Sequence, residues 1–207
     1  MEASLDLGEG RTGKVKRLSK ELRQIYTIQN FLSAEEIKHL RGSVPAPQYS
    51  WLRLTFGTGE AISVGSVSGK LRTDVIARMA HVLQVPTTHV EFGRAMHYRA
   101  GQGTHAHHDG STLIPRLSTL LVYLTTLPPE RGGATVFPQL TPPLSIQPEA
   151  GTALLWTNQK HLTSDPLDPD ILATHLGSEV LASTEEAEPK IVLTCWSRPA
   201  QCNSYSY

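Results

Sequence analysis

The second half of the chain is a succession of short apolar segments separated by turn residues, and this pattern most constrains the fold. From residue 88 onward, segments rich in β-branched, aromatic and aliphatic residues recur, each bounded by Gly, Pro or Asn. They read "RLSTLLVYLTT", "GGATVFP", "LSIQP", "GTALLWTN" and "KIVLTCWSRP". Segments of this kind predict strands, and a spacing of about ten residues between them is typical of an all-β sandwich or barrel.

Two segments that precede the strands predict helices, which we expect to pack on the outside of the β structure. In "FLSAEEIKHLRG", Ser33 is a candidate N-cap, Glu36 completes a capping box, and Gly42 is placed to end the helix. A second helix is predicted within "GKLRTDVIARMAHVLQVP", where Pro86 ends it. Its apolar face consists of Val75, Met79, Val82 and Leu83.

Length and composition suit one globular domain that can bury a core. The chain has 207 residues, of which 39% are hydrophobic. Its 19 basic and 19 acidic residues give a formal net charge of zero. That balance argues against a nucleic acid as the main partner, because binding a polyanion needs an excess of Lys and Arg. No apolar run approaches the roughly 18 residues that would cross a bilayer, so no membrane partner is expected.

The two ends of the chain are expected to lie outside the domain. The start, "MEASLDLGEGRTGKVKRLSK", is charged and lacks the apolar core of a secretory signal. We expect a flexible tail over residues 1–22, a domain over 23–199 and a short flexible tail over 200–207. Cys195 and Cys202 are too few for a disulfide framework, which indicates a reducing compartment and hence a cytoplasmic location.

The stretch "GQGTHAHHDG" concentrates histidines beside an aspartate and is the main candidate site. It holds His105, His107, His108 and Asp109. One interpretation is a solvated polar turn. A second is a zinc site built on His105, His107 and a third histidine, because alternate residues of an extended chain point the same way.

A third interpretation joins His107 to Asp109, which also lie two residues apart and share a face of an extended chain. With one later histidine they would form a facial triad of two histidines and one carboxylate. Such a triad leaves three positions of Fe(II) open. Either His161 or His175 can supply the third ligand.

The motifs resemble, as an ordered set, the prolyl 4-hydroxylase-like branch of the Fe(II)- and 2-oxoglutarate-dependent dioxygenases. The resemblance covers roughly residues 26–198. It rests on "NFLSAEEIKHL", "HYRAGQGTHAHHD", "RLSTLLVYLTT", "GGATVFP", "GTALLWTN", "THLG" and "PKIVLTCW", in that order. It implies a double-stranded β-helix, that is, a cupin-like jelly roll with supporting helices. The strand pattern agrees with this fold.

The resemblance also implies a set of metal ligands. His107 and Asp109 match the H-x-D metal pair of the family. His175, which opens "HLG", matches the distal metal histidine. His161 lacks that context and is interpreted as a loop residue.

Four further residues match positions that hold 2-oxoglutarate in the family. Lys190 matches the lysine that binds the far carboxylate, and Trp196 matches an aromatic residue six positions beyond it. Tyr98 and Thr119 match hydroxyl-bearing residues of the same pocket. Independently of the family, Lys190 and Trp196 share a face of a regular strand. A lysine buried there needs an anionic partner; the alternative is a surface lysine.

The implied reaction is hydroxylation of an unactivated C–H bond with Fe(II), 2-oxoglutarate, dioxygen and ascorbate, releasing succinate and CO2. Prolyl 4-hydroxylation of a peptide or protein is the family's usual activity. Three departures from the family leave the substrate open. Only six residues, 110–115, separate Asp109 from the next strand, and Lys190 follows His175 by fifteen positions, more than the family leads us to expect. The segment 57–70 is short and rich in Gly and Ser, where peptide-hydroxylating members have a substrate-covering loop with an arginine. A non-prolyl or small-molecule substrate, and a non-catalytic metal-binding interaction module, stay as alternatives.

Overall fold

The computed structural model describes residues 2–19, 24–42, 60–62, 70–110, 115–160, 168–182 and 188–199. Two sheets and two α-helices make up this part of the chain. The large sheet has eight strands in the order β1-β2-β3-β9-β6-β11-β5-β4, and the small sheet has three in the order β10-β7-β8. The strands are β1 (Glu2–Asp6), β2 (Thr12–Arg17), β3 (Ile25–Gln29), β4 (Glu60–Ile62), β5 (Val90–Tyr98), β6 (Ser118–Tyr123), β7 (Thr135–Phe137), β8 (Leu144–Ile146), β9 (Ala153–Thr157), β10 (Leu176–Gly177) and β11 (Lys190–Ser197).

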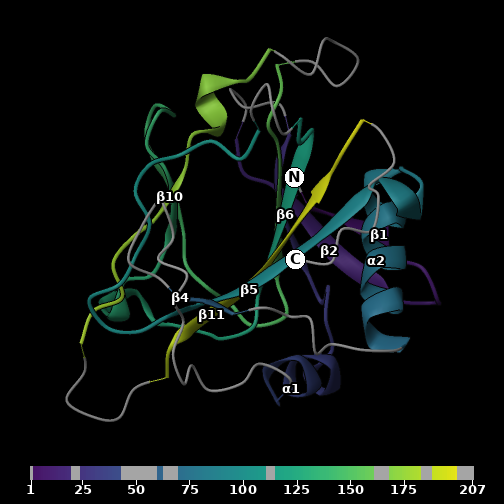
Figure 1. Ribbon diagram of the computed structural model, residues 1–207, viewed down its shortest axis with the longest axis horizontal. Helices are drawn as coiled ribbons and strands as arrows, with labels where there is room; N and C mark the ends of the chain where they lie inside the picture. Colours follow the sequence, from purple (N-terminus) through teal and green to yellow (C-terminus); the bar gives the residue numbers. More distant parts are fainter. Residues whose placement is uncertain are drawn as a thin grey trace.

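The elements form layers around the large sheet (Figure 1). Helices α1 (Ala34–Gly42) and α2 (Lys70–Leu83) lie on one side, and the small sheet lies on the other. One apolar core, which includes Phe31, Met79 and Leu193, fills the space beneath the helices. A second core, which includes Phe137 and Trp156, lies between the two sheets. The expected mainly β fold with supporting helices is confirmed.

Both predicted helices are confirmed with their caps and buried faces. The Ser33 hydroxyl accepts from the Glu36 N–H at 3.2 Å, and the Glu36 carboxylate accepts from the Ser33 N–H at 2.7 Å. This reciprocal pair is the predicted capping box. In α2, Val75 and Met79 are fully buried, and Val82 and Leu83 pack against the same core.

The five strands predicted after residue 88 are present as β6, β7, β8, β9 and β11. The N-terminal segment differs from the flexible tail that we expected. Its strands β1 and β2 form an antiparallel hairpin, and β2 pairs with β3 to extend the large sheet. Most of its charged residues, such as Lys14 and Lys16, are exposed, whereas Leu7 is 1% exposed and Val15 packs on the core.

The turn of this hairpin depends on glycine. Gly8 and Gly10 have φ angles of 82° and 74°, in the left-handed region that glycine tolerates without steric cost. Arg11 then pairs with Glu36 of α1 at 2.8 Å, and Glu36 also accepts from the buried Arg78 of α2 at 2.8 Å. The hairpin is therefore tied to both helices. Residues 200–207, expected to be a second tail, lie outside the described residues.

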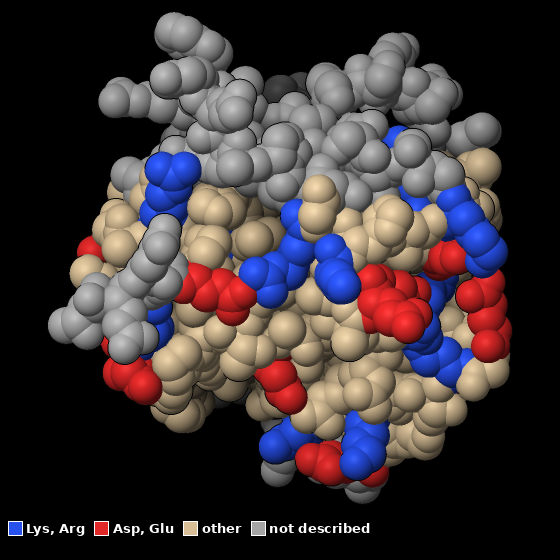
Figure 2. Space-filling model, turned by 90° about the horizontal axis from the view of Figure 1, so that it is seen from below, with Lys and Arg blue, Asp and Glu red and all other residues tan. Residues whose placement is uncertain are grey.

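The surface agrees with the charge balance. On the face drawn in Figure 2, basic and acidic side chains are interspersed among the described residues. None of the described helices is long and apolar enough to cross a membrane.

Candidate metal centre and cosubstrate pocket

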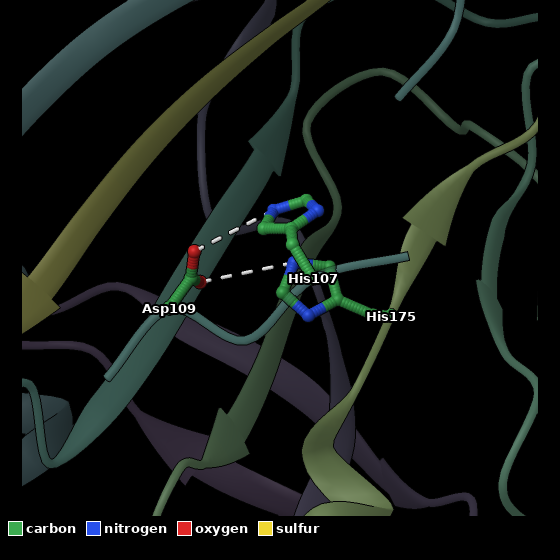
Figure 3. Close-up of side chains that lie close together, drawn as sticks. All are labelled: His107, Asp109 and His175. Atoms are coloured by element: carbon green, nitrogen blue, oxygen red, sulfur yellow. Dashed lines mark ion pairs between the residues drawn. The ribbon is translucent and has the colours of Figure 1, made fainter. Parts of the chain in front are cut away.

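The fold brings together His107, Asp109 and His175, the three residues that the sequence predicts as ligands. Their candidate ligand atoms all lie within 4.8 Å of one another. The Asp109 carboxylate faces both imidazole rings (Figure 3): Oδ1 lies 3.8 Å from Nε2 of His107, and Oδ2 lies 3.8 Å from Nε2 of His175. Two nitrogen donors and one carboxylate form the facial set that suits Fe(II).

Backbone pairing fixes the two histidines opposite each other. The segment after β5 runs antiparallel to the segment around β10, and His107 and His175 exchange two N–H···O bonds of 2.9 Å. Nearby, a β-carbon on Gly103 would lie 2.7 Å from the Gly177 carbonyl, so only glycine permits this approach. This pairing places His175, 68 positions further along the chain than His107, against the H-x-D motif.

Hydrogen bonds select the tautomer of both rings. Nδ1 of His107 lies 2.8 Å from the carbonyl of His105, and Nδ1 of His175 lies 3.0 Å from the carbonyl of Ala173. A carbonyl only accepts, so in each neutral ring Nδ1 carries the proton and Nε2 keeps its lone pair. Both lone pairs are available to a metal, as in metal sites where a backbone carbonyl orients the ligand histidine.

The charges of the cluster also suit a cation. Burial alone would raise the pKa of Asp109, but His175, the hydroxyl of Thr119 and His107 together hold that pKa below its usual value. Burial lowers the pKa of His175 to about 4, so this ring is neutral near pH 7. An ionised carboxylate beside neutral imidazole is the protonation state that binds a metal.

Aromatic and polar neighbours hold the ligands in place. Trp156 packs edge-on against His175 with ring centroids 4.7 Å apart. Thr119 donates a 2.6 Å hydrogen bond to Oδ2 of Asp109, and Asn158 donates one of 2.9 Å to the Thr119 hydroxyl. The sequence predicted Thr119 as a pocket residue but did not single out Asn158, whose part depends on a contact between two different strands.

The predicted cosubstrate residues share one inner face of the large sheet. Trp196, Thr119 and Trp156 are successive cross-strand neighbours on β11, β6 and β9, and such neighbours point to the same side. Further along β11, Lys190 is the direct cross-strand neighbour of Tyr98 on β5. The strand alternation predicted from the sequence is thus observed.

Lys190 is buried, not a surface residue. It is 3% exposed, and its ammonium lies 5.3 Å from the centre of the Tyr98 ring. Burial lowers the pKa of Lys190 to about 7, and no carboxylate among the described residues offsets this burial with a nearby charge. A buried ammonium without a counter-ion is costly unless a ligand supplies one.

Lys190 lies close to the segment that carries His175. A β-carbon on Gly177 would lie 3.3 Å from both Nζ of Lys190 and Oγ1 of Thr104. Gly177 follows His175 by two residues, about 7 Å along an extended chain. The Thr104 hydroxyl, which accepts from the Gly177 N–H at 2.6 Å, was not predicted from the sequence.

The other histidines of the motif do not join the cluster. The His105 side chain is exposed, and the His108 ring bonds instead to the backbone of Gly110, with Nδ1 2.8 Å from its carbonyl. His161 lies outside the described residues. Among the described residues, His107, Asp109 and His175 are the only group able to hold a metal ion.

Comparison with known proteins identifies the family. A sequence model of the 2OG-Fe(II) oxygenase superfamily matches residues 93–198, just over half of the chain. The chain therefore belongs to the 2OG-Fe(II) oxygenase superfamily, whose members are 2-oxoglutarate-dependent dioxygenases. No curated protein sequence matches the chain.

Solved structures share the fold at low identity. The viral collagen prolyl hydroxylase of Paramecium bursaria Chlorella virus-1, solved with 2OG, is 21% identical, with a TM-score of 0.63 over 85% of this chain and 96% of that one. A prolyl-4-hydroxylase from Pseudomonas putida is 14% identical, with a TM-score of 0.60 over 84% and 91%. A Trichoplax adhaerens prolyl hydroxylase in complex with a hypoxia inducible factor peptide is 14% identical, with a TM-score of 0.58 over 86% and 84%. These likenesses confirm the jelly-roll fold.

Proposed function

We propose that this protein is an Fe(II)- and 2-oxoglutarate-dependent hydroxylase and that its substrate is a prolyl residue of a peptide or protein. His107, Asp109 and His175 would hold Fe(II), and Lys190 would bind the distal carboxylate of 2-oxoglutarate. When bound, the ferrous ion supplies the redox chemistry that couples oxidative decarboxylation of 2-oxoglutarate by dioxygen to insertion of oxygen into a C–H bond. Succinate, CO2 and the hydroxylated substrate are the products.

The single observation that carries the proposal is the position of the buried Lys190: its Nζ lies beside Gly177, which follows the candidate ligand His175 by two residues. A five-carbon dicarboxylate with one end at the triad would present its other carboxylate to the Lys190 ammonium. The charge-assisted bond would also supply the counter-ion that this lysine lacks. Tyr98, whose pKa is raised by burial and by the charge of Asp109, stays a neutral phenol beside it.

The protein's part in the reaction is to orient the reactants and to exclude water. Tyr98 and Trp196 lie on the same inner face of the sheet as Lys190, so they would line the wall along which 2-oxoglutarate lies. Thr119 would border the same space while holding Asp109. Ascorbate would keep the iron reduced in turnovers that are not coupled to a substrate.

The prolyl substrate is supported by the shared fold of the prolyl hydroxylases from virus, bacterium and animal. One of these was solved with a hypoxia inducible factor peptide, and another is named a collagen prolyl hydroxylase. A small-molecule substrate has a structural parallel too: the nogalamycin-biosynthesis epimerase SnoN shares the fold at 13% identity and a TM-score of 0.57.

Mass spectrometry of a proline-rich peptide library tests the substrate. The library is incubated with the protein, Fe(II), 2-oxoglutarate and ascorbate, and the expected result is the gain of one oxygen on proline, accompanied by succinate. Asp109→Ala is the matched control. Succinate formation without any modified peptide would point to a small molecule, and absence of succinate with Fe(II) would leave a non-catalytic metal-binding module.

A further inference from the structure

Asn158 is a fully buried polar residue that none of the proposed catalytic roles uses. It follows β9 directly, and its backbone is fixed on both sides: its N–H donates to the Leu117 carbonyl at 2.8 Å, and its carbonyl accepts from the Asp170 N–H at 2.9 Å. Its side-chain Oδ1 is buried and has no hydrogen-bond partner among the described residues. Such an orphaned buried atom is unfavourable and calls for a reason to keep the amide there.

The reason lies in the direction of the hydrogen bonds. Thr119 donates its single hydroxyl proton to Oδ2 of Asp109 at 2.6 Å. The Thr119 oxygen can then only accept from its other neighbour. The Asn158 amide must therefore present its NH2 group to Thr119, because the reverse orientation would place two acceptors together.

The chain Asn158 to Thr119 to Asp109 connects the rigid sheet to a loop residue. Thr119 is fully buried on β6 between Trp156 and Trp196, whereas Asp109 lies beyond β5, outside any strand. Hydrogen bonds in series strengthen one another in a medium of low dielectric constant. The carboxylate is therefore held by a side-chain relay anchored on β6 and directly after β9.

We propose that Asn158 is a positioning residue that, through Thr119, orients the Asp109 carboxylate so that Oδ2 stays engaged by the protein and Oδ1 faces the metal. This inference rests on the proposed function, because it assumes that Asp109 is a ligand. Because the Thr119 hydroxyl already engages Oδ2, this carboxylate favours a single metal bond, through Oδ1. The positions that 2-oxoglutarate and dioxygen require then stay open.

The test is calorimetric titration of the metal-free protein with Mn(II), without 2-oxoglutarate. Thr119→Val keeps the shape and removes the hydroxyl, and should weaken Mn(II) binding by about 10- to 100-fold, as loss of an outer hydrogen-bond partner does. Thr119→Ser retains the hydroxyl and should keep affinity near that of the wild type. Asn158→Leu should weaken binding on the order of threefold to tenfold, since it acts one step further away.

The double variant separates a relay from two independent structural roles. Because Asn158 acts only through Thr119, Thr119→Val with Asn158→Leu should bind no more weakly than Thr119→Val alone. The visible spectrum of the Co(II) protein should change in the same variants, since it reports how the carboxylate binds. Thr157→Val is the matched control: Thr157 is buried and adjacent, but it pairs with Ser118, so it points to the opposite side of the sheet from Thr119.

The outcomes separate the relay from the proposed function. Additive losses in the double variant, a Ser variant as weak as the Val variant, or unchanged affinity in Thr119→Val would overturn the relay while Asp109→Ala still abolishes binding. Wild-type protein that binds no Mn(II), or whose binding survives Asp109→Ala, would overturn the proposed function as well. If Thr119→Val does not fold, the Mn(II) affinities of Thr119→Ser and Asn158→Leu still test the relay: the first should stay near that of the wild type and the second should fall.

Discussion

At the triad, the carboxylate and both imidazoles are held by hydrogen bonds within the protein, whereas at the other end of the pocket the buried Lys190 has no anionic partner among the described residues. The first end is preorganised: its tautomers, protonation states and orientations suit a cation before one arrives. The second end is electrostatically incomplete, and a dianion would complete it. On the proposed function, the metal and the cosubstrate would therefore bind at separable ends of the site.

The largest expected effect is at the triad. Asp109→Ala removes the only anionic ligand of the triad. Loss of an outer hydrogen-bond partner weakens metal binding by up to roughly 100-fold, and loss of the ligand itself should weaken Mn(II) or Fe(II) binding by more than that. Succinate formation should be abolished. His175→Ala should act similarly. His105→Ala is the matched control and should retain binding, since its side chain is exposed and outside the cluster. Equal losses in His105→Ala and Asp109→Ala would point to a different ligand set.

Lys190→Ala should weaken the binding of 2-oxoglutarate and leave the binding of the metal unchanged. A charge-assisted hydrogen bond is worth on the order of 1.5–3 kcal/mol, and about 1.4 kcal/mol corresponds to one decade. Binding of 2-oxoglutarate should therefore weaken by roughly one to two decades, while Mn(II) affinity stays close to that of the wild type. Anaerobic calorimetry of both ligands measures this separation. Unchanged affinity for 2-oxoglutarate in Lys190→Ala would remove the lysine from the pocket's function.

The protonation of Lys190 should also make the stability of the protein depend on pH. Burial lowers the pKa of Lys190 from 10.5 to about 7, so above pH 7 the unliganded folded protein holds this side chain neutral. The unfolded chain keeps the proton up to the higher pKa, so this group's contribution to the free energy of unfolding rises between pH 7 and 10.5.

Binding of 2-oxoglutarate above pH 7 should then take up as much as one proton, and its affinity should fall by up to about tenfold per pH unit. Calorimetry in buffers with different ionisation enthalpies counts the proton. Lys190→Arg is the control, because a guanidinium stays charged and should lose the pH dependence even if it binds more weakly. Binding without proton uptake in the wild type would place the ammonium in contact with water or with an anion already present.

A smaller effect is expected from Gly177→Ala. The added methyl group would stand 3.3 Å from both the Lys190 ammonium and the Thr104 hydroxyl, so these groups must shift by a few tenths of an ångström. We expect a loss in 2-oxoglutarate affinity of a few-fold, on the order of 1 kcal/mol or less, with Mn(II) affinity unchanged. A loss of metal binding instead would show that the two ends are mechanically coupled through β10.

The sequence predicts which candidate site residues the fold brings together better than it predicts the edges of the fold. His107 and Asp109 are two residues apart, and strand alternation places Lys190 and Trp196 on one face, so local geometry is enough to relate them. The N-terminal hairpin was missed because its many charges suggest a solvated tail. Its Leu5, Leu7 and Val15 alternate with polar residues, which is the pattern of a strand with one buried face.

The relations that the sequence could not reveal are those between distant strands. Asn158 and Thr104 become relevant only when β9 is placed beside β6 and when the segment after β5 is placed against β10. The choice of His175 as third ligand needed the family resemblance, because spacing alone left His161 equally eligible. Trp156, which packs on His175, was visible only as a strand residue.

The most direct test of a pocket with a metal end and a lysine end is the absorption spectrum of the ferrous protein during anaerobic titration with 2-oxoglutarate. A 2-oxo acid that chelates Fe(II) gives a visible charge-transfer band, so the band reports both partners together. It should appear in the wild type, require roughly 10- to 100-fold more 2-oxoglutarate in Lys190→Ala, and be absent in Asp109→Ala. A band of wild-type strength in Asp109→Ala, or no band in the wild type, would contradict the assignment.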